Sequence, residues 1–573
     1  MSPDRLVDFR QIWFVDFEYQ PVPGDLPSVI CMVAREWRSG QTIRMWKDQL
    51  TILTRPPFSQ DSDCLYIPFF ASAEFSCHLA LNWPLPANVV DLYVENRNLT
   101  NGFHLLRGNG LLGALFHHGI GSIEHEEKTE MRDLAIRGGP WSDDERRKLL
   151  DYCESDVIAL SKLFDRVFPK IDLPRALLRG RYMKAVARME ATGVPIDEEM
   201  HDLIMRNAED IRTNLIRDLG AVYGVYEQGH FRHHLFEAYL TKMSIEWPRL
   251  PSSQLDLKDD TFSYMAMLYL KLKNLKILRS HLGQLQMKRL PLGYDGRNRC
   301  MLSPFASKTG RNQPRSTNFV FGRAKWIRRL ITPPPGRALL YIDYEQQEFG
   351  IAAALSGDSV MQDAYNSDDP YLSFAKQAGA APETASKRTH RQLRDIYKAC
   401  ALAVQYGMGA DSLAFRTGRK PVDAKALLNT HRRLYSDYWN WSENAVSYAS
   451  LMGKIHTAFG WTLHVTHTTN PRTLQNFPMQ ANGAEILRLA CCFLCESGIT
   501  VCAPIHDAVL VECAIDDIAE TLHDSKLMLA KASRIVLGGF ELRTGVQTIE
   551  YPRTLGGDDN DDIWRVIQTT VSR

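Results

Sequence analysis

The chain has no long hydrophobic run. Among its 573 residues, no apolar stretch approaches the roughly 18 residues of a membrane span, and no secretory signal pattern opens the sequence. The 11 cysteines show no paired extracellular spacing, so we expect a reducing, cytoplasmic setting without membrane contact. Cys492 and Cys495 form a lone Cys-x-x-Cys pair. No second pair follows at zinc spacing, which indicates core thiols.

An excess of charge of one sign is absent as well. The formal net charge is +1, which gives no global sign of a polyanionic partner. The sequence contains no internal repeat and no low-complexity tract, and its 45% of hydrophobic residues suffices for the cores of two to four domains. Any interaction with nucleic acid therefore has to depend on local charge.

Residues 261–294 supply local charge, because they contain no acidic residue. Basic side chains are interleaved here with Leu and Met, which predicts an amphipathic helix suited to following phosphates without reading bases. A solvated surface helix is the alternative interpretation. The basic residues of the segment are Lys271, Lys273, Lys276, Arg279, Lys288 and Arg289.

Two carboxylates stand at the ends of predicted strands. Asp343 closes the apolar run 338–342, and Asp507 follows His506 between two further apolar runs. Hard divalent ions prefer oxygen ligands, and two of them roughly 4 Å apart clamp the attacking and leaving oxygens of a phosphoryl transfer. Rigid strands that hold two carboxylates suit such a site. An isolated Asp at a strand end is more often a turn or cap residue.

A basic helix is predicted between the two acids, over residues 387–407. Arg394, Lys398, Leu402 and Tyr406 recur every four residues and therefore share one face. Two cations lie at one end of this face and an aromatic ring at the other, which matches the phosphates and the base of a nucleoside triphosphate. A surface helix with a solvated basic face is the alternative.

Together these segments resemble the family A DNA polymerases, from about residue 185 to the C-terminus. Residues 343–348 look like the first palm motif of the family, residues 394–406 like its fingers helix, and His506-Asp507 like its second palm motif. The further matches are Met189-Glu190, Gly193-Val194, Asp197, Thr309-Gly310-Arg311, Arg472, Asn476 and Gln480.

The resemblance implies roles for single residues. Asp343 and Asp507 would be metal ligands for two Mg²⁺ ions, and Lys398 would donate a proton to pyrophosphate. Glu348 would lie under the sugar, where it clashes with a 2′-hydroxyl. The implied deoxynucleotide site consists of Arg394, Lys398, Leu402, Tyr406, Glu348, Gln346 and His506. The implied contacts to DNA are Arg311 near the primer, Arg472, Asn476 and Gln480 near the active site, and Lys271, Lys273 and Lys276 in the thumb.

Some positions depart from the family pattern. Leu402 stands where an aromatic residue is usual, so stacking on the nucleotide should be weaker. Ala508 replaces a common third acid, and we expect activity to survive if the backbone carbonyl of Asp343 contributes to the metal site. Gln347 and Phe349-Gly350 also differ from the usual residues, which makes the chain a divergent member.

The first 180 residues carry a second set of acids. Asp16 and Glu18 follow the strand-like run 12–15, and Tyr152 and Asp156 lie one turn apart in the predicted helix 142–167. In this order they resemble the 3′-5′ exonuclease of the ribonuclease-H-like class, which implies that Asp16, Glu18 and Asp156 are metal ligands for Mg²⁺ or Mn²⁺.

The middle of the exonuclease motif is incomplete. Ser72 and Ser76 stand where the family has Asn and Asp, so one metal ligand is missing. Glu74 would point about 200° away from Ser76 in a helix and would need a local rearrangement to replace it. Asp91 could add charge nearby. We therefore expect a retained fold with weak or absent exonuclease activity.

The expected fold is α/β and multidomain: a ribonuclease-H-like exonuclease domain in residues 1–178, followed by a right-hand polymerase domain in residues 179–573. Pro169 and Pro174 mark the boundary. The thumb should occupy about 185–300, the palm about 301–360 and 466–573, and the fingers about 361–465. The chain leaves no room for an N-terminal 5′-nuclease domain.

The sequence therefore predicts a DNA-dependent DNA polymerase that acts on primer-template DNA and deoxynucleoside triphosphates. We expect a monomer of phage or mobile-element type in a bacterial or phage-infected cell, compatible with accessory replication proteins. A single-subunit RNA polymerase of the same fold is one alternative, although Glu348 argues against it. A nuclease that grips DNA with a polymerase-like domain is another, and a catalytically silent DNA-binding protein is the third.

Overall fold

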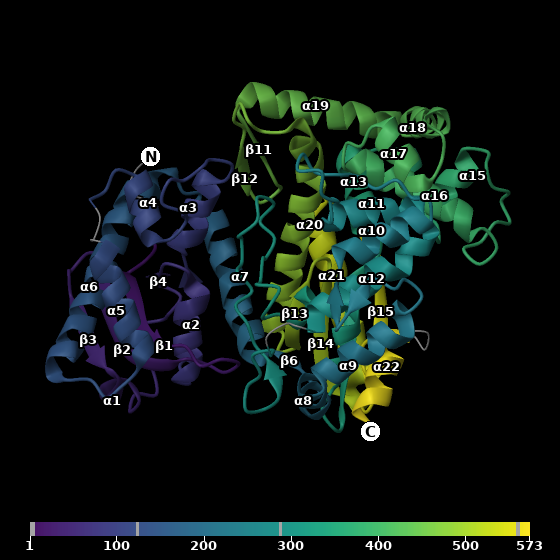
Figure 1. The fold of residues 1–573 in the computed structure, drawn as a ribbon. Coiled ribbons are helices and arrows are strands. Elements are labelled where there is room, and N and C mark those ends of the chain that lie inside the picture. Colours follow the sequence, from purple (N-terminus) through teal and green to yellow (C-terminus); the bar gives the residue numbers. More distant parts are fainter. Residues whose placement is uncertain (1–5, 122–124, 286–288, 557–561, 573) are drawn as a thin grey trace.

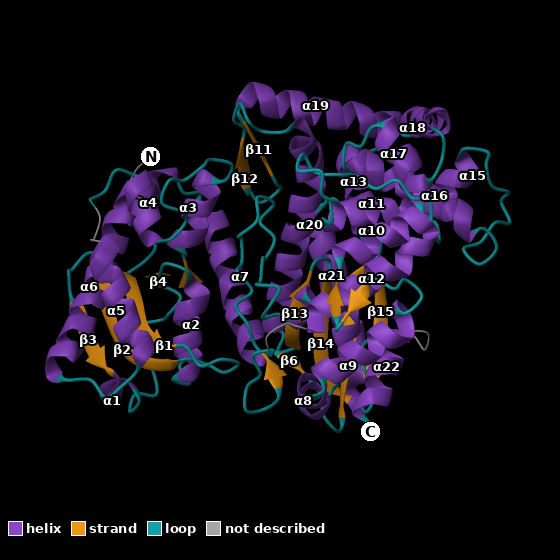
Figure 2. Ribbon diagram, viewed as in Figure 1, coloured by secondary structure: helices purple, strands orange, loops and turns teal. Residues whose placement is uncertain are grey.

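The computed structural model describes residues 6–121, 125–285, 289–556 and 562–572, and Figures 1 and 2 show two lobes joined by the long helix α7 (Leu173–Thr192). Glycine allows the helix to approach the smaller lobe closely. A Cβ at Gly180 would lie 2.0 Å from the carbonyl oxygen of Val89. Helix α7 packs against elements of both lobes and runs without a break through residue 178, the expected domain boundary.

The N-terminal lobe is a five-stranded sheet covered by helices, with strand order β3-β2-β1-β4-β5. Its central strand β1 pairs antiparallel with β2 and parallel with β4. Its strands are β1 Gln11–Gln20, β2 Ser28–Glu36, β3 Thr42–Trp46, β4 Cys64–Ile67 and β5 Asn88–Val89. Its helices are α1 Lys47–Leu50, α2 Ala71–Ala80, α3 Leu92–Thr100, α4 Leu111–His117, α5 His125–Arg137 and α6 Asp143–Val167.

Helix α6 begins where the sequence predicts. Ser142 accepts a hydrogen bond from the backbone N–H of Glu145, and the Glu145 side chain accepts one from the backbone N–H of Ser142, which forms a capping box. The helix buries Leu149, Cys153, Leu160 and other apolar residues at helical spacing against the sheet. This packing fixes the face of α6 that meets β1.

A helical unit follows α7 and has its own core around Phe236, Trp247 and Phe262. The single helix predicted over residues 261–294 is wrong, because the chain is extended at Tyr269 and turns through a 3-10 segment. The turn changes the helical phase, so Leu272 joins the core. Lys288 lies outside the described residues. The helices of this unit are α8 Glu198–Arg206, α9 Ala208–Leu215, α10 His233–Lys242, α11 Asp259–Leu268 and α12 Lys273–Leu285. Two short strand pairs accompany them: β6 Val194–Pro195 with β9 Arg297–Asn298, and β7 Tyr226–Glu227 with β8 His230–Phe231.

The larger lobe is built on a four-stranded antiparallel sheet of order β13-β14-β10-β15. The strands are β10 Arg337–Tyr344, β13 Thr500–Ile505, β14 Ala508–Ala514 and β15 Thr544–Glu550. Helices α20 (Pro471–Glu496) and α21 (Ile518–Val536) pack against each other beside it, and α22 (Asp562–Val571) lies near the C-terminus. Cys491, Cys492 and Cys495 are buried in α20, as predicted for core thiols.

A helical region follows β10 and returns to α20 through a hairpin. Figure 1 shows α19 spanning the top of this lobe. The helices are α13 Gln347–Ser356, α14 Ser359–Asn366, α15 Pro370–Gln377, α16 Arg391–Gln405, α17 Ala410–Thr417, α18 Pro421–Leu434 and α19 Ser436–Met452, and the hairpin strands are β11 Lys454–His456 and β12 Thr462–His464. Among the described residues, no helix has the length and apolar character needed to cross a membrane.

Candidate active site

Asp343 and Asp507 meet at one end of the antiparallel sheet. In the register of β10 and β14, Asp343 lies opposite Ala508, directly after Asp507. The backbone N–H of Tyr344 donates to the carbonyl oxygen of Asp507 at 3.1 Å. His506 has a left-handed backbone (φ 51°) in the tight turn between β13 and β14. The sheet therefore brings together two acids that are far apart in the sequence.

Burial disfavours the charged form of both acids. It raises the pKa of Asp343, and the charge of Glu345 adds to this shift. Burial also raises the pKa of Asp507, and the charge of Asp343 adds to the shift, whereas Arg311 and His506 oppose it. A cation between the two carboxylates would offset this cost. Their oxygen donors fit Mg²⁺.

In the part of the chain that the structure describes, no group of three or more His, Cys, Asp or Glu side chains is arranged to hold a metal ion. Asp343 and Asp507 are thus a pair of acids, in keeping with Ala508 at the position of a third. Gly545, opposite Asp343 on β15, leaves room for the Asp343 carboxylate: a Cβ there would lie 2.9 Å from its Oδ1.

Four predicted site residues from four segments form one hydrogen-bonded network. The hydroxyl of Tyr406 donates to Oε1 of Glu348 at 3.3 Å, and Arg311 approaches the same oxygen at 3.5 Å. Nε2 of Gln480 donates to the Tyr406 hydroxyl at 3.4 Å. The end of α16, the first turn of α13, helix α20 and the loop after residue 303 therefore meet at one place.

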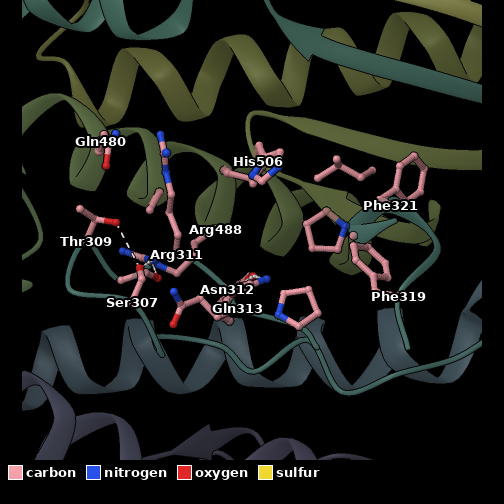
Figure 3. Close-up of a pocket in the computed structure, with 18 residues that line it drawn as sticks. Ser307, Thr309, Arg311, Asn312, Gln313, Phe319, Phe321, Gln480, Arg488 and His506 are labelled. Carbon is pink, nitrogen blue, oxygen red and sulfur yellow. Dashed lines mark hydrogen bonds between the residues drawn. The ribbon is translucent and has the colours of Figure 1, made fainter. Parts of the chain in front are cut away.

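A cavity of about 480 Å³ lies beside Arg311 and Gln480 of this network and beside His506, the residue before Asp507 (Figure 3). Arg311, Gln480 and His506 line it from three separate segments. Arg488 of α20 lines it too, and its guanidinium donates to the carbonyl oxygen of Gly310 at 2.7 Å. Arg488 was not among the residues predicted for the site, although it is the single cation within the largely apolar stretch 484–495.

Arg394 and Lys398 on α16 lie over one aromatic ring. Their charged groups are 5.2 and 5.8 Å from the centre of the Tyr371 ring. Arg394 is buried and paired with Asp369 at 2.5 Å and with Asp395 at 3.2 Å. Burial opposes its charge, but these ion pairs raise the pKa of Arg394. No pattern in the sequence indicated that Asp369 and Tyr371 would be neighbours of these two cations.

A second cavity, of about 560 Å³, lies between the end of β10 and the helices after it. Its lining includes Gln346, Glu345, Arg394 and Lys376. Gln346 is held at this wall because its Oε1 accepts a hydrogen bond from Arg543 at 3.2 Å. Leu402 lies on α16 between Arg394 and Tyr406 and is partly buried. The cavity therefore presents both signs of charge near the predicted nucleotide-binding residues.

The predicted DNA contacts fall into two groups. Arg472, Asn476 and Gln480 stand one turn apart on α20 and share a face. The end of α16 packs on this face, since a Cβ at Gly407 would lie 2.9 Å from Arg472. The second group consists of the three lysines predicted for the thumb. Lys271 lies in the turn before α12, and Lys273 and Lys276 lie on α12, outside the linings of both cavities.

The N-terminal lobe brings its predicted acids together as well. Asp16 and Glu18 of β1 and Asp156 of α6 all act on Tyr152: burial raises the pKa of its phenol, and the three negative charges raise it further. The thiol of Cys153 on α6 donates to the carbonyl oxygen of Asp16 at 3.2 Å. The contact fixes α6 against β1 at the position of the acids.

The expectation that Glu74 needs a local rearrangement to reach the acids is wrong. Glu74 is buried, the backbone N–H of Phe17 donates to its carboxylate, and burial and the charges of Asp16 and Glu18 raise its pKa. Pairing of β1 with β4 ends at Phe14, which leaves the N–H of Phe17 available to α2. Glu74 thus faces the acids without rearrangement, whereas the hydroxyl of Ser76 donates to the carbonyl oxygen of its own helix.

Asp91 has a structural role. Its carboxylate accepts hydrogen bonds from four backbone N–H groups, those of Phe70, Ala71, Tyr93 and Val94. Burial raises the pKa of Asp91 to about 6 against the effect of these donors. The carboxylate caps α3 and fixes the start of α2, and its charge also contributes to the raised pKa of Glu74 in the acid cluster.

Comparison with known proteins gives a consistent picture. Residues 295–546 match the family model of DNA polymerase family A. The chain is 28% identical over 226 residues to DNA polymerase I of Pseudomonas aeruginosa, covering 36% of this chain and 24% of the relative. It is 26% identical over 226 residues to the DNA polymerase of Mycobacterium phage D29, covering 38% and 36%. It is 23% identical over 430 residues to DNA polymerase I of Aquifex aeolicus, covering 68% and 73%.

The chain spans less than two fifths of the length of the Pseudomonas and phage relatives. Among solved structures, it resembles the POL domain of Pol1 from M. smegmatis in complex with DNA primer-template and dNTP. The TM-score is 0.70, the identity is 16%, and the match covers 96% of each chain. This likeness extends over both lobes and shows a shared fold.

Proposed function

We propose that the protein is a template-directed DNA polymerase, because its residues 295–546 match the family model of DNA polymerase family A. It would add deoxynucleotides to the 3′ end of a primer. The observation that carries this proposal is the meeting of Asp343 and Asp507 beside the network of Arg311, Glu348 and Tyr406. These residues provide oxygen donors for cations, a positive group for DNA and a wall for the sugar.

Asp343 and Asp507 would hold two Mg²⁺ ions, whose chemistry when bound is to activate the primer 3′-hydroxyl and to support the leaving pyrophosphate. Lys398 is exposed on α16 and would donate a proton to the pyrophosphate. Arg394 lines the charged cavity and would exchange its partner Asp369 for a phosphate group, since guanidinium and phosphate form strong paired hydrogen bonds.

Glu348 would lie under the sugar of the incoming nucleotide. Its carboxylate is held by Tyr406 and Arg311, so it has little freedom to move away from a 2′-hydroxyl. Tyr406 would cover the base pair, and Leu402 would contact the nucleotide without aromatic stacking. His506 and Gln346 would line opposite sides of the site. These roles favour deoxynucleotides over ribonucleotides.

Template and primer would cross α20. Arg472, Asn476 and Gln480 share a face of this helix, and Gln480 and Arg311 line the same cavity. The exposed thumb lysines Lys271 and Lys273 would contact phosphates farther along the duplex. The predicted division into thumb, palm and fingers belongs to this proposal.

The N-terminal lobe would be an exonuclease-like domain with weak or absent activity. Asp16, Glu18 and Asp156 lie close together, but Ser76 offers its hydroxyl to its own helix. Asp91 is occupied by backbone donors. A monomer in the cytoplasm of a bacterial or phage-infected cell, with accessory replication proteins as partners, is part of the same proposal.

A labelled primer-template tests the function directly. Incubation with Mg²⁺ and four deoxynucleotides should extend the primer, and Asp343→Ala should abolish extension while Asp16→Ala leaves it intact. Ribonucleotides in place of deoxynucleotides test the RNA polymerase alternative. Without nucleotides, we expect little shortening of the primer. A wild-type protein that binds the DNA but never extends the primer would overturn the proposal.

A further inference from the structure

The loop that carries Arg311 has an unfavourable backbone. Ser303 and Phe305 both have positive φ angles, of 49° and 56°, although side chains disfavour this region. Gly310 has a φ of 73°, and a Cβ there would lie 3.1 Å from Nε1 of Trp461. Such a conformation persists only where surrounding contacts determine it. The source of those contacts therefore decides where Arg311 lies.

Many of these contacts come from the N-terminal lobe. Nη2 of Arg97 on α3 donates to the carbonyl oxygen of Ala306 at 2.9 Å, and Nε of Arg97 donates to the carbonyl oxygen of Phe305 at 3.4 Å. The side-chain amide of Asn101, at the end of α3, donates to the carbonyl oxygen of Lys308 at 2.8 Å. Two side chains, one on α3 and one at its end, thus contact three carbonyl groups of the loop.

The same end of α3 also holds the β11–β12 hairpin. The Asn101 amide donates to the carbonyl oxygen of Thr462 at 2.8 Å, and Oδ1 of Asn98 accepts from the backbone N–H of Thr462 at 2.7 Å. The indole of Trp461 then donates to the carbonyl oxygen of Lys308 at 3.0 Å. Asn101, the hairpin and the loop are therefore joined through one carbonyl group.

This carbonyl group lies close to Arg311 in the chain. The backbone N–H of Arg311 donates to Oγ of Ser307 at 2.8 Å, and the N–H of Gly310 donates to the carbonyl oxygen of Ser307 at 3.0 Å. The hydroxyl of Ser307 also lies 3.1 Å from that of Thr309 (Figure 3). Residues 307–311 form a compact turn, so a shift at Lys308 would move Arg311.

Helix α3 is itself held firmly. Glu95, two residues before Arg97, forms a buried ion pair with Arg179 of α7, with both hydrogen bonds at 2.7 Å. Asn101 is almost fully buried, with 1% of its surface exposed. The helix that carries these side chains is therefore firmly held, and the burial of Asn101 shields its hydrogen bonds from water.

We propose that the N-terminal lobe acts as a positioning module for the primer side of the polymerase site, with Asn101 as its central positioning residue. Asn101, supported by Arg97 and Asn98, holds the strained loop 303–311 so that Arg311 is aimed at the primer end. This role explains why the lobe would be kept even without nuclease activity. The inference rests on the proposed polymerase function.

Asn101→Ala is the first test. It removes both donors to Lys308 and Thr462, and we expect the affinity for primer-template DNA, measured by fluorescence anisotropy, to fall roughly tenfold. Asn88→Ala is a matched control, since the Asn88 amide also donates to two carbonyl oxygens, those of Ser62 and Cys64, but within its own lobe. This control should bind DNA like the wild type.

A double-mutant cycle separates positioning from general stability. If Asn101 acts through Arg311, then Asn101→Ala should weaken primer-template binding little further in an Arg311→Ala background. If the double variant instead loses affinity by the product of the two single losses, the residues act independently and the proposal is overturned. Arg97→Gln provides a second variant if Asn101→Ala fails to fold, and it should weaken binding in the same direction.

The outcomes distinguish this inference from the function on which it rests. If the wild type does not extend primers, the proposed polymerase activity fails. If the wild type extends primers and Asn101→Ala binds and extends them equally well, the positioning role fails. A raised KM for primer-template with an unchanged KM for the nucleotide, in folded Asn101→Ala protein, is the expected result.

Discussion

The hydroxyl of Tyr406 lies 3.3 Å from Oε1 of Glu348 and joins the end of α16 to the first turn of α13. Arg311 approaches the same carboxylate oxygen from the loop beneath. A charge-assisted contact of this kind restricts the carboxylate more than a solvated side chain would be restricted. Tyr406 and Arg311 therefore hold the Glu348 carboxylate at the point where α13 and the end of α16 meet.

Removing the Glu348 carboxylate should relax the selection of deoxynucleotides over ribonucleotides. For Glu348→Ala, we expect the ratio of kcat/KM for deoxynucleotides over ribonucleotides to fall by roughly tenfold or more, since the clash with a 2′-hydroxyl is lost. Tyr406→Phe keeps the ring and removes only the hydrogen bond, so its effect should be smaller. Single-nucleotide incorporation kinetics measure the ratio. An unchanged ratio in Glu348→Ala would show that another residue excludes ribonucleotides.

A methyl group at Gly545 should displace the Asp343 carboxylate. The Cβ would lie 2.9 Å from Oδ1 of Asp343, closer than such contacts normally allow. We expect Gly545→Ala to slow primer extension by about a hundredfold, because small displacements in a catalytic site have large effects. DNA binding should be retained. Gly110→Ala is the control, since its Cβ meets open space; equal extension by both variants would contradict the prediction.

The stability of the protein should fall with rising pH because of Glu190. Burial raises the pKa of Glu190 to about 8, although the backbone N–H of Leu302 donates to its carboxylate at 2.6 Å. The folded state thus binds a proton that the unfolded chain releases above about pH 4.3. The stabilising contribution of protonated Glu190 is complete below about pH 4.3 and is lost as the pH rises through 8.

Glu190→Gln should remove this dependence. The free energy of unfolding of the wild type should decrease relative to the variant by up to about 1.4 kcal/mol per pH unit between pH 5 and pH 8. Denaturant unfolding at several pH values measures the difference. The variant should match the wild type best near pH 4 and exceed it most at pH 8, whereas parallel curves would mean that Glu190 titrates normally.

Breaking the ion pair between α3 and α7 should destabilise the N-terminal lobe. Glu95 and Arg179 are both buried and share two hydrogen bonds of 2.7 Å. Glu95→Leu leaves the guanidinium buried without its partner, so we expect a loss of about 3–5 kcal/mol in the free energy of unfolding. Combination with Arg179→Met should recover part of the loss. A double variant less stable than the single one would contradict this account.

The sequence by itself determined the local elements that carry the site. Continuous apolar runs located β1 and β10 and placed Asp343 near the end of β10, whereas β1 continues past Asp16 and Glu18 to Gln20. Helical spacing placed Tyr152 with Asp156 on α6 and located α16, which ends at Gln405 before a glycine with positive φ. These features depend on neighbours within a few residues, so their pattern is visible in the chain.

Tertiary structure alone decided which side chains meet. The surroundings of Glu74 depend on where β4 stops pairing with β1, and one partner of Arg394 is Asp369, which caps another helix. The hold of Asn101 on Lys308 joins residues 207 positions apart. Such contacts arise from the docking of whole elements, whose relative positions follow from the packing of the entire core and leave no local pattern in the sequence.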